Sequence, residues 1–265
     1  MNCKNCYKTL NDTQRFCDEC GAKVIQNRLT PKVLATQVNE EFISIDNKFL
    51  RTFVNLLKKP EDVINGYIDG TRKKYINVIQ YFAIALTVAG IHFFLMKTFF
   101  MDQFESAFQI IDPNVDNTEF MMNYQKALND IAGSGNNFQS LIYILSVPFS
   151  AIGTWIAYNF TGTKVYNFTE HIVINLYYYG QSIIISSLFS IFGYIVGINM
   201  AISATIVMLL IMIYQFYVFK RVTGHGTIET IAKVILSYII LGLQVLILLI
   251  LLIIIVVLLK AINII

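Results

Sequence analysis

Long apolar runs separated by polar segments fill the second part of the chain, and each run has the length of a membrane-crossing helix. A helix needs roughly 20 apolar residues to cross a hydrocarbon core of about 30 Å. Five runs reach this length, at residues 78–100, 138–159, 175–198, 200–219 and 233–259. Only the short stretch GINMA divides the third run from the fourth. The pattern therefore predicts five transmembrane helices, the third and fourth of which form a tight antiparallel pair.

A different pattern precedes the first run, within residues 30–77. Apolar residues recur there at helical spacing, namely Phe49, Leu50, Phe53, Val54, Leu56 and Leu57. The other side of the same helix carries Lys48, Arg51, Thr52, Asn55, Lys58 and Lys59. Pro60 ends this helix and can begin a second short one that Gly70 closes. The segment is thus predicted to form a basic amphipathic helix and a short helix before the first span.

The partner of the amphipathic helix is left open by the pattern. The pattern is typical of a helix that lies in a membrane interface, where anionic headgroups attract basic side chains. It can equally pack on cytoplasmic loops of the same protein, because amphipathicity alone does not name the partner. The residues expected to bind the membrane surface are Lys48, Arg51, Lys58, Lys59, Arg72, Lys73 and Lys74.

Composition and charge add an orientation to this arrangement. The 265 residues are 55% hydrophobic, and the mean hydropathy of +0.58 is too high for a soluble domain. Basic residues gather near one set of span ends, Lys58, Lys59, Arg72, Lys73, Lys74, Lys164, Lys220, Arg221 and Lys233, against Lys97, Lys126 and Lys260 near the other. By the positive-inside rule the N-terminus is cytoplasmic and the C-terminus external. An acidic loop at residues 101–137 is expected on the external side of an inner membrane.

Four cysteines lie within the first twenty residues, in two Cys-x-x-Cys pairs: Cys3, Cys6, Cys17 and Cys20. No secretory stretch accompanies them, so we expect them in the reducing cytoplasm, where paired thiols are metal ligands more often than disulfides. Two pairs at this spacing complete a tetrahedral shell for Zn²⁺, and a structural zinc must stabilise so small a segment. The alternative is a pair of redox dithiols. Tyr7 stands where a glycine commonly follows the first pair, while Gly21 follows the second.

These observations predict an all-α membrane protein with three parts: a zinc ribbon at residues 1–29, the helical segment at 30–77 and five spans over 78–265. Within the ribbon, five basic residues stand against three acidic ones. A centre of Zn²⁺ with four thiolates adds two negative charges, so the sum is zero. A neutral module lacks the positive charge that drives nucleic-acid binding. We therefore expect a cytoplasmic protein partner for the ribbon and membrane lipid for the helices.

The stretches DNKFLRTFVNLLKKPEDVINGYIDGTRKKYINVIQYF and KVYNFTEHIVINLYYY resemble an uncharacterised family of bacterial integral membrane proteins that carry an N-terminal zinc ribbon. Where that family often has a proline after the asparagine of YIN, this chain has Val78. The topology, with five spans and a cytoplasmic N-terminus, is also similar to that of Yip-type proteins of membrane trafficking. Neither resemblance implies a catalytic residue.

Polar residues at two expected cytoplasmic loops are candidates for further chemistry. Glu170 and His171 lie at the start of the third run, and His225 and Glu229 lie four residues apart before the fifth. They can form a second metal or acid–base site. Alternatively, the glutamates occupy first helical turns behind the N-caps Thr169 and Thr227, and the histidines are interface residues.

The spans hold few polar groups that would support transport. The polar residues expected to face the bundle interior are His92, Gln181, Gln215 and Gln244. No Asp, Glu or Arg lies deep in a run, whereas coupled carriers usually use a buried ionisable residue. Gly193 and Gly197 form a G-x-x-x-G motif that favours close helix contact within one chain or in a homo-oligomer. No catalytic motif is present.

The sequence thus favours a non-enzymatic adaptor or membrane-organising factor over a small-solute transporter or channel subunit, and a membrane-embedded enzyme comes third.

Overall fold

The computed structural model describes residues 1–11, 13–22, 24, 30–31, 48–100, 139–160 and 166–261. The chain divides into two compact units, Met1–Asn47 and Lys48–Ile265. The expected external loop at residues 101–137 lies outside the described residues.

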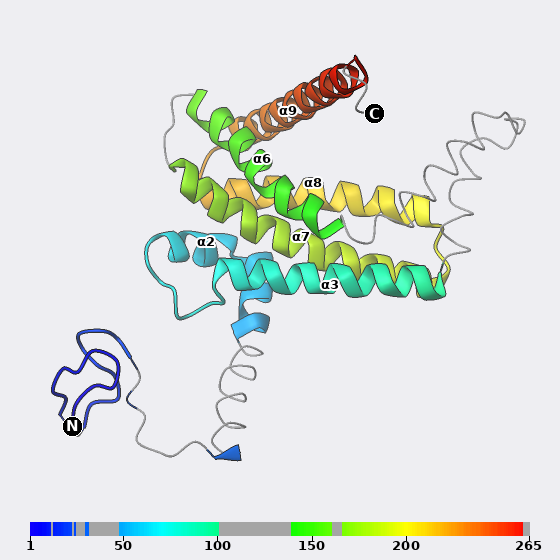
Figure 1. Cartoon of the computed structure of the whole chain (residues 1–265). Helices are drawn as coiled ribbons and strands as arrows, with labels where there is room; N and C mark the ends of the chain where they lie inside the picture. Colours follow the sequence, from blue (N-terminus) through cyan, green and yellow to red (C-terminus); the bar gives the residue numbers. More distant parts are fainter. Residues whose placement is uncertain are drawn as a thin grey trace, which may run out of the picture. The chain divides into compact units, whose positions relative to one another are not determined.

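The described residues of the second unit form helices joined by turns, with no strand, which confirms the predicted fold class. Its helices are α2 (Pro60–Ile68), α3 (Val78–Phe99), α6 (Gln139–Phe160), α7 (Phe168–Val196), α8 (Met200–Thr223) and α9 (Thr227–Ala261) (Figure 1). Residues 48–58 form a further helical stretch before α2. Five of these helices, α3 and α6 to α9, are long and apolar enough to cross a membrane. The chain thus has the helices of a multi-pass membrane protein.

Helices α7 and α9 begin before the apolar runs that predicted them. They start at residues 168 and 227, whereas the runs start at residues 175 and 233. At α7 the reason is a capping box. The Asn167 side chain accepts a hydrogen bond from the Glu170 backbone N–H at 2.9 Å, and the Glu170 carboxylate accepts one from the Asn167 N–H at 2.7 Å. Satisfying these N–H groups lets a polar turn join the helix ahead of the apolar stretch.

Helix α7 is the centre of the bundle, because it packs against α3, α6 and α8, and α6 in turn packs against α9 (Figure 1). Two glycines mark the closest approaches. A Cβ at Gly180 would lie 3.0 Å from the Tyr81 ring, and one at Gly153 would lie 3.1 Å from the Ser237 carbonyl oxygen. Small residues therefore set the spacing of α7 to α3 and of α6 to α9, as in other membrane helix pairs.

The pair formed by α7 and α8 is the tight hairpin expected from the stretch GINMA. Gly197, with φ of +79°, ends α7 in a left-handed conformation, and the Asn199 side chain caps α8 by accepting from the Ala201 N–H at 2.9 Å. A Cβ at Gly193 would lie 3.1 Å from the Ser203 hydroxyl oxygen of α8. The first glycine of the G-x-x-x-G motif thus serves a contact within the chain.

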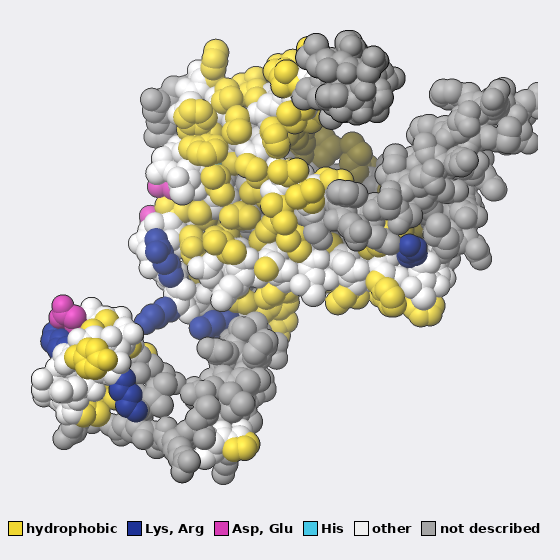
Figure 2. Space-filling view, in the orientation of Figure 1, with side chains coloured by type: hydrophobic (Ala, Val, Ile, Leu, Met, Phe, Trp, Pro, Cys, Tyr) yellow, Lys and Arg dark blue, Asp and Glu magenta, His cyan; other side chains and the backbone are white. Residues whose placement is uncertain are grey.

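Apolar side chains cover much of the visible face of the long helices (Figure 2). Examples with high exposure lie on α3, α7 and α8, namely Ile79, Phe94, Phe192, Met208 and Ile213. In a soluble protein such an exposed apolar surface would be unfavourable. On helices of this length it is the surface expected to contact lipid.

The helix at residues 48–58 is tied to the bundle through its backbone. The hydroxyl groups of Tyr214 and Tyr217 on α8 donate to the carbonyl oxygens of Leu56 and Lys58 at 3.1 and 2.8 Å. An ion pair between Arg221 and Glu61 joins α8 to α2. Residues 48–77 therefore share a compact unit with the five long helices.

Candidate metal centre and a buried polar cluster

Two knuckles of the same geometry hold the four cysteines, and the second repeats the first fourteen residues later. In the first, the Tyr7 N–H donates to the Cys3 carbonyl at 2.8 Å, and in the second the Gly21 N–H donates to the Cys17 carbonyl at 2.9 Å. The Cys3 and Cys17 N–H groups each donate at 2.8 Å, to the carbonyls of Lys8 and Ala22. Each Cys-x-x-Cys pair is thus held by one tight turn.

Both turns need a residue in the left-handed region. Tyr7 has φ of +62° and Gly21 has φ of +69°. Tyr7 therefore adopts the conformation that a glycine commonly supplies after such a pair. Its side chain is 80% exposed, so the ring meets no crowding, and the strain is confined to the backbone.

The four thiols converge on one point. Their sulfur atoms all lie within 4.8 Å of one another, and the two contacts at 3.6 Å join different knuckles, Cys3 to Cys20 and Cys6 to Cys17. Zinc–sulfur bonds of about 2.3 Å in a tetrahedron place the sulfurs about 3.8 Å apart. The four cysteines can therefore bind a single metal ion, with every coordination position filled by protein.

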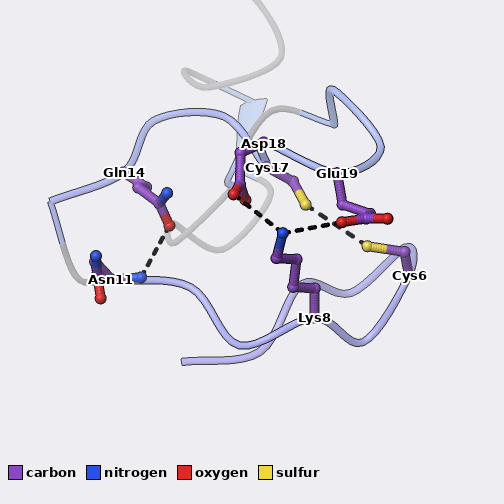
Figure 3. Close-up of polar contacts among 7 residues, drawn as sticks. All are labelled: Cys6, Lys8, Asn11, Gln14, Cys17, Asp18 and Glu19. Carbon is purple, nitrogen blue, oxygen red and sulfur yellow. Dashed lines mark hydrogen bonds and ion pairs between the residues drawn. The ribbon is translucent and has the colours of Figure 1, made fainter.

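Hydrogen bonds and an ion pair prepare the ligands. Backbone N–H groups of Cys6 and Asn5 lower the pKa of Cys3, and the Asn5 side chain with the Ala22 N–H lowers the pKa of Cys20 to about 6. Lower pKa values favour the thiolates that a metal requires. The pKa of Cys6 is instead raised to about 12, because the hydrogen bond from the Lys8 N–H, which lowers it, is outweighed by the contact with the Cys20 thiol and by desolvation, so the thiolates of Cys3 and Cys20 are favoured but that of Cys6 is not. The Lys8 ammonium donates to Asp18 at 3.1 Å and to Glu19 at 2.9 Å, which links the two knuckles (Figure 3).

The residues proposed for a second site take different positions in the second unit. Glu170 belongs to the capping box of α7, in which Asn167, rather than Thr169, is the N-cap. His171 is buried, and its Nδ1 lies 3.2 Å from the Thr154 hydroxyl oxygen of α6. His225 Nδ1 lies 3.5 Å from a Glu229 carboxylate oxygen.

Thr227, the other expected N-cap, is the first residue of α9, where its hydroxyl accepts a hydrogen bond from the Lys220 ammonium at 2.8 Å. Among the described residues only the four cysteines form a group with metal-ligand geometry.

Tyr158 brings the two histidines into one cluster. Its ring centroid lies 5.7 Å from the ring of His171 and 5.7 Å from that of His225. The Lys233 ammonium sits 4.7 Å from the same centroid and 2.6 Å from a Glu229 carboxylate oxygen. Lys233 is only 1% exposed. The result is a polar cluster of five residues, in which Tyr158, His171 and Lys233 are buried, whereas His225 is half-buried and Glu229 is exposed.

Sequence reasoning missed the central members of this cluster. Lys233 was counted only as a basic residue near a span end, although its position four residues after Glu229 places the pair on one helix face. Nothing in the sequence marked Tyr158. Burial lowers the pKa of His225, and the positive charge of Lys233 lowers it further, whereas the negative charge of Glu229 raises it.

Glutamines inside the bundle pair with tyrosines. Gln181 accepts a hydrogen bond from Tyr81, and Gln215 accepts from Tyr178 at 3.3 Å and from Tyr238. Both glutamines are buried, as expected. The buried amide atoms of Gln244 have no partner among the described residues. His92 lies in the second half of α3, and its Nε2 is 3.4 Å from the Tyr194 hydroxyl oxygen of α7.

The basic residues before the first span are exposed, except for Lys48, which is half-buried. Two of them contact tyrosine rings, the Arg72 guanidinium at 5.6 Å from Tyr67 and the Lys74 ammonium at 5.1 Å from Tyr75.

Residues 46–90 match a family described as a protein of unknown function (DUF3667). The match covers the helix at residues 48–58, α2 and the first part of α3, and it excludes the cysteines. It agrees with the expected resemblance to an uncharacterised family. No curated protein and no solved structure matches the chain.

Proposed function

We propose that the protein is a non-enzymatic adaptor or membrane-organising factor of a bacterial inner membrane, which presents a zinc ribbon to a cytoplasmic protein. The observation that carries the proposal is the closed group of four thiols, within 4.8 Å of one another, in a chain with five membrane-length helices. Zinc is the metal that such a shell fits best. Since the protein fills all four positions, the metal stabilises the ribbon and performs no chemistry.

The surface of the ribbon supports a protein partner. Two aromatic side chains are exposed on it, Tyr7 at 80% and Phe16 at 56%. Exposed aromatic residues are enriched among the residues that dominate protein interfaces. The ribbon's balanced charge, counted with the metal, argues against a nucleic-acid partner. The basic asymmetry of the loops supports a cytoplasmic location for the ribbon.

The first experiment is metal analysis of the purified full chain under reducing conditions. We expect one zinc per chain in the wild type and a loss of zinc in Cys17→Ser, with the spans still inserted. A wild-type chain that holds no zinc contradicts the proposal.

The second experiment is crosslinking in cells from a photoreactive amino acid placed at Phe16. We expect a defined adduct with one cytoplasmic protein, and we expect Cys17→Ser to abolish it because the ribbon unfolds. A matched control places the same photoreactive group at Phe192, an exposed residue of α7, where the adduct should be absent. An identical adduct with and without Cys17 would mean that the ribbon does not recognise the partner.

A specific observation favours small-solute transport as a second candidate. Lys233 is buried within α9 and is ion-paired with Glu229 beside His225. Ionisable residues buried in membrane helices often belong to solute or proton pathways. Flux of protons or small solutes into vesicles that contain the purified protein tests this candidate. We then expect Lys233→Met to abolish flux while the protein stays folded, and the absence of flux in the wild type would reject transport.

A further inference from the structure

The helix at residues 48–58 has three distinct sides. One side is buried against the bundle: Thr52 and Leu56 are fully buried, and the Thr52 hydroxyl oxygen accepts a hydrogen bond from the Ile76 N–H at 3.1 Å. Phe49, on the same side, stacks on Tyr81 of α3 with the ring centroids 5.8 Å apart. This packing differs from the predicted division into two faces, because Thr52 was assigned to the polar side.

A second side is an apolar stripe that is partly exposed. It consists of Leu50, Val54 and Leu57, which are 60%, 39% and 41% exposed. Their spacing of four and three residues places them in one row along the helix. An ordinary surface helix would carry polar residues in such a row.

The third side is basic. Arg51 and Lys58 lie on it, and Lys59 follows at its end; all three are exposed. None of them forms an ion pair with a described residue. With about 100° of rotation per residue, the apolar stripe falls between the buried side and the basic side. An in-plane helix beside a membrane bundle needs this order of sides, because its buried side faces the bundle, its apolar stripe faces the acyl chains and its basic side faces the headgroups.

The attachment of the helix places it near the ends of the spans. Its carbonyl groups accept hydrogen bonds from Tyr214 and Tyr217, and Tyr217 lies six residues before the end of α8 at Thr223. Six residues of helix span about 9 Å, and the basic residues Lys220 and Arg221 lie within this last part of α8. The helix at residues 48–58 therefore contacts α8 near its basic end.

We propose that residues 48–58 form an in-plane helix that binds an anionic phospholipid surface. The side chains of Leu50, Val54 and Leu57 enter the acyl region, and Arg51, Lys58 and Lys59 contact phosphate headgroups. A stripe of three side chains is far smaller than a stable protein interface requires, which argues against a second copy or another protein as the occupant. This binding surface is separate from the metal centre and goes beyond the proposed function.

Tryptophan fluorescence in the full chain tests the proposal, because the sequence has a single tryptophan, Trp155. On a Trp155→Phe background, Val54→Trp reports the apolar stripe and Asn55→Trp reports the basic side. The proteins are placed in nanodiscs whose lipids are brominated within the acyl chains. We expect quenching of the Val54→Trp signal to be at least about twofold stronger than that of Asn55→Trp.

The headgroup contact is tested by changing Arg51, Lys58 and Lys59 together to glutamate. Replacing phosphatidylglycerol by phosphatidylcholine should weaken the quenching of Val54→Trp, and the triple change should remove this dependence on lipid charge. Equal quenching at positions 54 and 55 overturns the proposal. The proposal is also overturned if the Val54→Trp signal is protected from quenching only when each nanodisc holds several copies of the protein. That result would identify a second copy as the occupant of the stripe. Should Val54→Trp fail to fold, Leu57→Trp reports the same stripe.

Discussion

At the scale of single residues, the metal centre shows how the backbone constrains sequence. Both knuckles require a left-handed residue, and the chain meets the requirement once with a glycine and once with Tyr7, at φ of +62°. A non-glycine residue in this region costs roughly 1–2 kcal/mol. Because folding of the ribbon and metal binding are coupled, that cost lowers the affinity for the metal.

The substitution Tyr7→Gly is therefore expected to tighten metal binding. Relief of the backbone strain outweighs the extra flexibility of glycine in the unfolded chain, which costs about 0.5–1 kcal/mol. The net gain of about 1 kcal/mol or less corresponds to a roughly twofold to fivefold lower dissociation constant. Competition with a chelator on the purified full chain measures it.

Gly21→Ala is the matched control at the equivalent position. A Cβ there would meet no atom within 4 Å, so the substitution isolates the backbone effect and, by the same arithmetic, should weaken binding by roughly twofold to fivefold. If Tyr7→Gly also weakened binding, the Tyr7 side chain would have to make a stabilising contact that outweighs its strain.

Another residue-scale prediction concerns His225. The unfolded residue titrates near 6.5, and burial lowers the pKa in the folded protein. Between these two values the unfolded state binds more protons, so His225 reduces stability as the pH falls below about 6.5. We expect the thermal midpoint to drop less for His225→Gln than for the wild type between about pH 7.5 and pH 5.5. Parallel curves for the two proteins would show that the pKa of His225 is the same in the folded and unfolded states.

These residues also show which site features can be predicted from sequence. The spacing of the cysteines predicted the metal ligands, because each knuckle is a local turn whose geometry depends on a few neighbouring residues. The cluster around Tyr158 was not predicted. Its members come from α6, α7, α9 and the turn before α9, and only tertiary packing brings them to one ring.

At the scale of elements, hydropathy located the five long helices but not all their ends. Apolar runs mark the part of a helix that suits lipid, whereas helix starts depend on caps such as Asn167 at α7. Periodicity also predicted the helix at residues 48–58, yet it assigned Thr52 to the polar side, whereas Thr52 is buried against the bundle. The hydrogen bond from the Ile76 N–H to the Thr52 hydroxyl oxygen joins residues far apart in the sequence, so it has no signature in an apolar pattern.

Contact between elements yields a prediction at Gly153, where α6 approaches α9. A Cβ at this position would lie 3.1 Å from the Ser237 carbonyl oxygen, a backbone atom that cannot turn away as a side chain can. Gly153→Ala should therefore separate the two helices and destabilise the bundle by about 1–3 kcal/mol. Thermal unfolding in detergent measures the change.

Gly242→Ala is the matched control on α9, since a Cβ there would meet nothing within 4 Å. It should leave stability unchanged or raise it by up to about 1 kcal/mol, because alanine favours a helix more than glycine does. Equal effects of the two substitutions would mean that close packing at Gly153 does not hold α6 and α9 together.

At the scale of the whole molecule, an odd number of spans places the two ends of the chain on opposite sides of the membrane. The count depends on the α7–α8 hairpin, where Gly197 ends one helix and Asn199 caps the next. Both helices are long enough to cross by themselves, with 29 and 24 residues. The distribution of basic residues then predicts a cytoplasmic N-terminus.

Reporter fusions test this topology, which is the prediction on which the cytoplasmic role of the ribbon depends. Reporters that are active only in the cytoplasm should work when fused after Gly21 or Arg221, because basic residues flank these points. Reporters that are active only outside should work after Asp116 and after Ile265, positions beyond the described residues that the five spans assign to the other side. A cytoplasmic signal at Ile265 together with an external signal at Asp116 would require an even number of spans. One of the four helices α6 to α9 would then fail to cross the bilayer, because loss of α7 and α8 together would leave the number of spans odd.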